Sequence, residues 1–225
     1  PPLRAANNDI VLLRAFEEAL MPLRCVFCGS LSRAPERYIC VGCHDDLPFI
    51  ESPPSPVSSP LEHDVAPLAY EFPVDAAIKA LKFRRQLFYA PALSELLIGA
   101  CPNLPGEIDA VLPVPLHWRR RWRRGFNQAL EIAAPVACHL GVPLIYSVRR
   151  KRATPFQSGL SAHDRARNMR KAFNVRGDLA CRHVLIVDDV ITTGTTVHQL
   201  ARVLHRAGVA CVSALAVARA QTRIT

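Results

Sequence analysis

Residues 184–196 constrain the fold of this chain more than any other stretch. They read VLIVDDVITTGTT: four apolar residues, two neighbouring aspartates, and a threonine-rich loop around one glycine. Apolar side chains then recur at helical spacing at Val197, Leu200, Ala201 and Leu204, and Gly208 is suited to end that helix. A buried strand that runs through a small polar loop into a helix is typical of proteins built on a parallel sheet.

The rest of residues 61–225 alternates in the same way. Strands are predicted at residues 111–115, 143–148, 184–188 and 210–218, and helices at residues 91–100, 127–140 and 195–207. Because parallel strands need crossover helices between them, the pattern predicts an α/β fold with a parallel sheet flanked by helices. Pro135 lies inside a helical pattern, so we expect it to bend or split that helix.

The loop after the aspartates predicts a binding site for a phosphorylated sugar. In open α/β sheets ligands bind beyond the carboxyl ends of the strands. The N–H groups of residues 192–196, their hydroxyls and the helix N-terminus suit a phosphate monoester. Asp188 and Asp189 would repel the phosphate itself, so they should face a ribose diol or a metal ion; a simple helix cap is the alternative. The motifs GxxxxGK[ST] and GxGxxG are absent from the sequence, which disfavours an ordinary nucleotide triphosphatase or dinucleotide fold.

Four cysteines near the start of the chain predict a metal site. Cys25 and Cys28 form one C-x2-C pair, and Cys40 and Cys43 form a second. Two such pairs at this spacing are typical of a structural Zn²⁺ site, with two disulfides as the alternative. We therefore expect residues 1–50 to hold a helix (residues 8–20) and a zinc module, residues 51–60 to be a Pro/Ser linker, and residues 61–225 to form the main domain.

The basic charge points to polyanionic or phosphorylated partners. The formal net charge is +9, and arginines at positions 119, 120, 121, 123 and 124 surround Trp118 and Trp122. This cluster suits pyrophosphate or single-stranded DNA with bases stacked on the indoles, and a solvated helix face is the alternative. Residues 149–172 are rich in basic side chains and lack apolar periodicity, which favours a functional lid or an unstructured connector.

In these motifs the chain resembles the type I phosphoribosyltransferases, and among them the ComF family. The resemblance rests on residues 184–196, the cysteine pairs, residues 78–83 (IKALKF), PVP at 113–115 running to RGFNQ at 124–128, and the pattern from Arg152 to Phe173. It covers nearly the whole chain. It implies a type I phosphoribosyltransferase fold preceded by a small zinc-ribbon-like module. Arg84, Arg85 and Gln86 depart from the family pattern, in which many members carry a glycine after the phenylalanine.

The resemblance also implies a ligand, 5-phosphoribosyl-1-pyrophosphate (PRPP) with Mg²⁺, and roles for named residues. Catalytic roles are implied for Asp188, Asp189, Arg150, Lys151, Arg152 and Gln157. Binding of PRPP is implied for Val190, Ile191, Thr192, Thr193, Gly194, Thr195, Thr196, Pro113, Val114, Pro115 and Lys82. The loop at 113–115 would hold pyrophosphate, and the basic segment would close over the ligand.

Two functional hypotheses follow. One is a glycosyl (pentosyl) transferase that moves phosphoribose to a nitrogen base and releases pyrophosphate. The other is a nucleic-acid-binding competence or DNA-uptake factor that uses the phosphoribosyl site for binding or regulation. The sequence holds no run of apolar residues long enough to span a membrane, and we expect a cytoplasmic protein. The acceptor base and the oligomeric state stay open.

Overall fold

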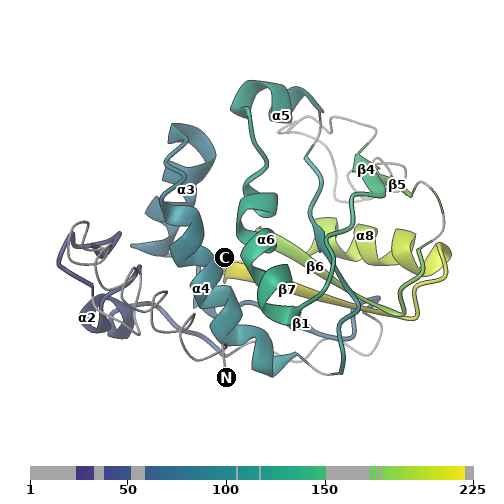
Figure 1. Ribbon diagram of the computed structural model, residues 1–225, viewed down its shortest axis with the longest axis horizontal. Helices are drawn as coiled ribbons and strands as arrows, with labels where there is room; N and C mark the ends of the chain where they lie inside the picture. Colours follow the sequence, from purple (N-terminus) through teal and green to yellow (C-terminus); the bar gives the residue numbers. More distant parts are fainter. Residues whose placement is uncertain are drawn as a thin grey trace, which may run out of the picture. The chain divides into compact units, whose positions relative to one another are not determined.

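The computed structural model divides the chain into two compact units, Pro1–Leu47 and Pro48–Thr225 (Figure 1). It describes residues 24–32, 38–51, 59–104, 106–116, 118–150, 173–175, 177 and 179–220. The predicted helix at 8–20 and most of the predicted linker, residues 52–58, lie outside the described residues. Residues 48–50, which the sequence placed in the first unit, pair with the second. There, Ile50 N–H donates to the Pro67 carbonyl at 2.8 Å.

The first unit is small and has little regular structure among its described residues. Arg24 and Leu31 form an isolated antiparallel bridge, and α2 covers Val41–Asp45. The N–H of Val26 donates to the Tyr38 carbonyl at 2.9 Å, which joins the segments that carry the two cysteine pairs.

The second unit contains the predicted parallel sheet. Its strands are β1 (Asp64–Val65), β2 (Leu68–Ala69), β3 (Ala110–Pro113), β6 (His183–Ile191) and β7 (Cys211–Arg219). The order is β1-β7-β6-β3, with β2 also paired to β7, and every pairing in this sheet is parallel. The α/β prediction is therefore confirmed.

The strand predicted at residues 143–148 is mostly replaced by other structure. Leu144 makes only an isolated parallel bridge to Val111, and Val148 begins β4 (Val148–Arg150), which pairs antiparallel with β5 (Phe173–Val175). The Pro143 carbonyl accepts the N–H of Val111, and the N–H of Ile145 donates to the Val111 carbonyl. Because Pro143 has no N–H of its own, it cannot donate a further hydrogen bond to extend this ladder.

The helices predicted at residues 91–100, 127–140 and 195–207 are present, and others join them. The helices are α3 (Val74–Arg84), α4 (Tyr89–Ala100), α5 (Trp118–Arg124), α6 (Gln128–Leu140) and α8 (Thr195–Arg206), with a 3-10 turn at Cys101–Asn103. The expected break at Pro135 was wrong as a split, because α6 continues through it as one helix. Ile132 and Val136 are fully buried on either side of Pro135, and their packing outweighs the lost hydrogen bond. No described helix is long and apolar enough to cross a bilayer.

The sheet, with β6 as an inner strand, lies between two helical layers (Figure 1). Val184 belongs to the buried cluster that contains Leu200 of α8. Leu185 points to the opposite side, where α6 packs on β6, and it is also fully buried. The same alternation at the end of the strand sends the side chains of Asp188 and Asp189 to different faces of the sheet.

Candidate functional site

The loop between β6 and α8 forms a small cavity at the carboxyl edge of the sheet. A volume of about 40 Å³ is lined by Asp188 and residues 190–197. The hydroxyls of Thr193 and Thr195 lie 2.8 Å apart, and the first N–H groups of α8 have no acceptor within the helix. The cavity is therefore lined by hydrogen-bond donors at the positive end of a helix.

Gly194 gives the loop its shape. Its φ is +69°, in the left-handed region that side chains rarely adopt. A Cβ at this position would also lie 3.2 Å from Cε1 of His198, one turn into α8. The sequence suggested the glycine, but nothing in it identified His198 as the side chain behind the loop.

Asp188 lies on the α8 side of the sheet, where it lines the cavity. Its Oδ1 accepts the N–H of Asp189 at 2.9 Å. Burial, together with the negative charge of Asp189, raises the pKa of Asp188 to about 8. Without a cation or a ligand, this carboxyl group is therefore largely protonated at neutral pH.

Asp189 points the other way and is only 3% exposed. Its Oδ1 lies 2.8 Å from Nζ of Lys82, which α3 brings across the opposite face. Its Oδ2 is buried and has no hydrogen-bond partner among the described residues. A buried carboxylate oxygen without a donor is costly, so this position suits a hydroxyl or a water molecule.

The loop after β3 lies beside the two aspartates. Pro113 is in register with Val187, and the N–H of Val114 donates to the Val187 carbonyl at 2.9 Å. From the other side, Nδ2 of Asn127 donates to the Val114 carbonyl at 3.2 Å, while its Oδ1 caps α6. Asn127 was not among the predicted site residues. It is the first residue of the helix predicted at 127–140 and lies in the RGFNQ segment of the family resemblance, and neither gave it a role at the site.

The other predicted catalytic residues lie in β4 or outside the described residues. Arg150 is in β4, with its guanidinium 5.5 Å from the ring centroid of Phe173. Lys151, Arg152 and Gln157 lie outside the described residues. The structure thus brings together the acid pair, Lys82, the β3 loop and the threonine loop.

A second ion pair borders the threonine loop on the β7 side. Arg219 is in register with Ile191 at the end of β6, and its Nη2 lies 2.8 Å from Oδ1 of Asp64. Burial lowers the pKa of the nearby His198, while the charge of Asp64 opposes that shift. Sequence reasoning missed these residues because they are far apart in the chain and none lies in a motif.

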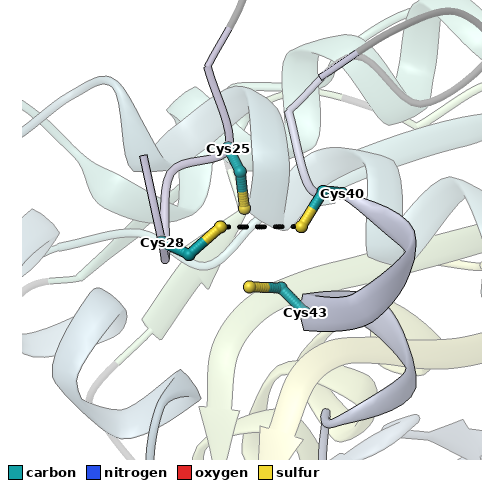
Figure 2. A group of neighbouring side chains, drawn as sticks. All are labelled: Cys25, Cys28, Cys40 and Cys43. Atoms are coloured by element: carbon teal, nitrogen blue, oxygen red, sulfur yellow. Dashed lines mark hydrogen bonds between the residues drawn. The ribbon is translucent and has the colours of Figure 1, made fainter. Parts of the chain in front are cut away.

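The four predicted cysteines of the first unit converge on one point, as Figure 2 shows. Their sulfur atoms all lie within 4.8 Å of one another, and Sγ of Cys28 is 3.6 Å from Sγ of Cys40. A disulfide needs about 2.05 Å, whereas sulfurs bound to one tetrahedral Zn²⁺ at about 2.3 Å lie about 3.8 Å apart. All four cysteines are free thiols. The cluster therefore fits a single thiolate-bound metal ion and does not fit two disulfides.

Comparison with known proteins identifies the family. The chain is 36% identical over 205 residues to the DNA utilization protein YhgH of Escherichia coli K12, covering 84% of this chain and 86% of that protein. It is 35% identical over 163 residues to competence protein F of Haemophilus influenzae, covering 67% of this chain and 70% of the relative. The chain belongs to the ComF family. Residues 127–224 also match the model of the phosphoribosyl transferase domain, so this ComF protein carries that domain behind its cysteine cluster.

Solved structures with a similar chain path share fewer identical residues with this chain. Glutamine phosphoribosylpyrophosphate amidotransferase from B. subtilis is 20% identical, with a TM-score of 0.43, covering 61% of this chain and 30% of that one. Orotate phosphoribosyltransferase from Aeropyrum pernix is 23% identical, with a TM-score of 0.39, covering 61% and 76%.

Proposed function

We propose that this ComF protein binds PRPP with Mg²⁺ at the carboxyl edge of its sheet and transfers the phosphoribosyl group to a nitrogen base. The observation that carries the proposal is the cavity in which the carboxyl group of Asp188 lies beside the donor-rich loop of residues 192–196. This combination matches the two ends of a ribose 5-phosphate: hydroxyls for the carboxyl group, and a phosphate for the N–H groups and hydroxyls.

In this proposal the residues of the site bind different parts of the ligand, and Asp188 also binds the metal ion. Thr192, Thr193, Gly194, Thr195 and Thr196 hold the 5-phosphate. Asp188 and the unpartnered oxygen of Asp189 accept hydrogen bonds from the ribose hydroxyls. Pro113, Val114 and Pro115 lie beside the pyrophosphate, with their loop fixed by Asn127. Asp188 is the carboxylate suited to Mg²⁺, which would neutralise the charge that develops on pyrophosphate.

The transfer itself is a displacement at C1 of the ribose. The acceptor nitrogen forms a bond to C1 as the bond from C1 to pyrophosphate breaks, and the electron pair leaves with pyrophosphate. The proton displaced from the nitrogen passes to solvent. Positive charge accumulates at C1 in this reaction, so a nearby carboxylate and bound pyrophosphate both stabilise the transition state. Arg150, Lys151, Arg152 and Gln157 are proposed to stabilise the departing anion.

In the first unit we propose a structural Zn²⁺ bound by Cys25, Cys28, Cys40 and Cys43. The four thiols match the ligand number and the sulfur spacing that this ion prefers. The described part of the unit has one short helix and one bridge, so its own packing offers little stability. Metal binding would then supply much of the folding free energy of this unit.

Calorimetry tests the binding proposal. The protein is titrated with PRPP in the presence of Mg²⁺, and pyrophosphate release is then measured over a panel of free bases. We expect saturable binding that weakens at least about tenfold in Asp188→Asn, equivalent to losing one good hydrogen bond. If PRPP binds but no base causes pyrophosphate release, the binding proposal stands and the proposed transferase activity is overturned. No binding of PRPP would overturn the proposal.

A second candidate function, binding of single-stranded nucleic acid, is favoured by one surface. On α5, Trp118 and Trp122 are 61% and 87% exposed, and the side chains of Arg121 and Arg123 are also exposed. Exposed indoles among arginines are suited to stacked bases and phosphates. The names of the relatives, DNA utilization protein and competence protein, agree with this candidate.

The two candidates respond differently to substitution. Binding of a labelled oligonucleotide should fall steeply with salt and should weaken in Trp122→Ala, yet persist in Asp188→Asn. Salt-dependent binding that is lost in Asp188→Asn would instead place the nucleic acid at the threonine loop.

A further inference from the structure

We infer that Lys82 is a positioning residue that acts on the sugar through Asp189, so that the two neighbouring aspartates have different tasks. This inference rests on the proposed binding of ribose phosphate. Lys82 holds one oxygen of Asp189 and leaves the other available to a ribose hydroxyl. Asp188 remains as the carboxyl group that faces the threonine loop and the metal ion.

The geometry of the ion pair supports this assignment. Nζ of Lys82 lies 2.8 Å from Oδ1 of Asp189, and the two side chains are 17% and 5% exposed. Burial of a carboxylate is costly unless a positive charge or hydrogen-bond donors compensate it. Lys82 forms the ion pair with Asp189, and this contact fixes the orientation of the carboxylate.

The second oxygen of Asp189 is the acceptor that we assign to a ribose hydroxyl. Oδ2 is buried without a hydrogen-bond partner among the described residues, whereas Oδ1 is paired with Lys82. Because Oδ1 is paired with Lys82, rotation of the carboxylate would break this ion pair. The result is an acceptor held in one direction before the ligand arrives, which lowers the cost of ordering it on binding.

The last turn of α3 is itself fixed, so Lys82 is presented from a defined backbone. Arg85 ends the helix with a left-handed φ of 55°, and its N–H donates to the Ala80 carbonyl. Its Nη2 donates to the Arg123 carbonyl of α5 at 3.2 Å. The guanidinium of Arg124 lies 5.1 Å from the ring centroid of Phe83. These contacts hold the turn that carries Lys82 against α5.

The competing role for Lys82 is direct contact with the pyrophosphate or phosphate of the ligand. The two roles differ in which fragment of the ligand binds more weakly after Lys82 is replaced. A residue that positions Asp189 affects ribose binding and leaves inorganic pyrophosphate unaffected. A direct phosphate contact affects pyrophosphate most.

The test is calorimetry of the full chain with ribose 5-phosphate and, separately, with inorganic pyrophosphate and Mg²⁺. The variants are Lys82→Met, Asp189→Asn and the double variant. Lys79→Met is the matched control, because Lys79 is an exposed lysine one turn earlier whose Nζ lies 2.6 Å from Asp75. We expect Lys82→Met to weaken ribose 5-phosphate at least about tenfold and pyrophosphate less than about twofold. The double variant should bind ribose 5-phosphate no more weakly than Asp189→Asn, because the effects of coupled residues do not add.

Each outcome decides a separate point. If the wild type binds neither probe, the proposed function fails and the role of Lys82 fails with it. If the wild type binds ribose 5-phosphate and Lys82→Met binds it equally well, only the positioning role is overturned. Additive losses, or a loss confined to pyrophosphate, would make Lys82 a direct ligand contact. If Lys82→Met fails to fold because Asp189 is left as an unpaired buried charge, the double variant, which removes both charges, is compared with Asp189→Asn by the same criteria.

Discussion

Replacing Gly194 with alanine tests whether the shape of the threonine loop matters. The φ of +69° costs an alanine about 1–2 kcal/mol. The new Cβ would also lie 3.2 Å from the ring of His198, which is tighter than an ordinary contact and forces the ring or the loop to move. Crowding of this kind adds about 1 kcal/mol or more, so we expect a total loss of about 2–3 kcal/mol.

Gly141→Ala is the matched control. Gly141 has a φ of +68° at the end of α6, and a Cβ there meets nothing within 4 Å. It therefore carries the backbone cost of about 1–2 kcal/mol without the contact. For a unit of this size, each kcal/mol lowers Tm by about 2–4 °C.

The assay is thermal unfolding of both variants, followed by calorimetry with ribose 5-phosphate. We expect Gly194→Ala to unfold several degrees below Gly141→Ala and to bind the ligand weakly or not at all, while Gly141→Ala binds it as the wild type does. Equal stability of the two variants would refute the argument from His198. Unchanged binding by Gly194→Ala would show that the loop does not hold the phosphate in this conformation.

Further predictions concern the metal centre, the acid pair and α6. Cys40→Ser should lose bound zinc by metal analysis, and a chelator should abolish the structure of the first unit while the second unit keeps its own thermal transition. Because the pKa of Asp188 rises from 3.8 to about 8 on folding, the folded state holds the extra proton and stability should fall as pH rises across that range. Asp188→Asn should flatten this dependence in denaturant titrations, and an unchanged slope would contradict it. Pro135→Ala should raise stability by up to about 3 kcal/mol, since α6 already runs through that position; a loss would mean that the ring packs favourably.

Local geometry in this protein follows closely from local sequence. The apolar run before Asp188 predicted a buried strand, and the structure extends it to a nine-residue β6. The spacing within each cysteine pair brings its thiols together through one turn, and the two pairs then meet within 4.8 Å. These features depend on neighbouring residues, whose backbone angles and side-chain directions the sequence largely specifies.

The directions of the two aspartate side chains could also have been predicted from the local sequence, but were not. The period of two along a strand already places Asp188 and Asp189 on opposite faces of a sheet buried on both sides. From their charge, both aspartates were expected to face a ribose diol or a metal ion. Applying the strand period to the motif would have anticipated that only one of them lines the loop cavity.

The sequence alone determined the parallel sheet, the helix after the threonine loop and the four-thiol cluster, because each arises from contacts between residues close along the chain or from an apolar repeat. Only the tertiary structure decided which partners meet across the sheet. Lys82 forms its ion pair with Asp189 because the last turn of α3 comes close to the end of β6. Asn127 holds the β3 loop because α6 begins beside it. Such pairings depend on how helices pack against a twisted sheet, and no spacing within one segment encodes that packing.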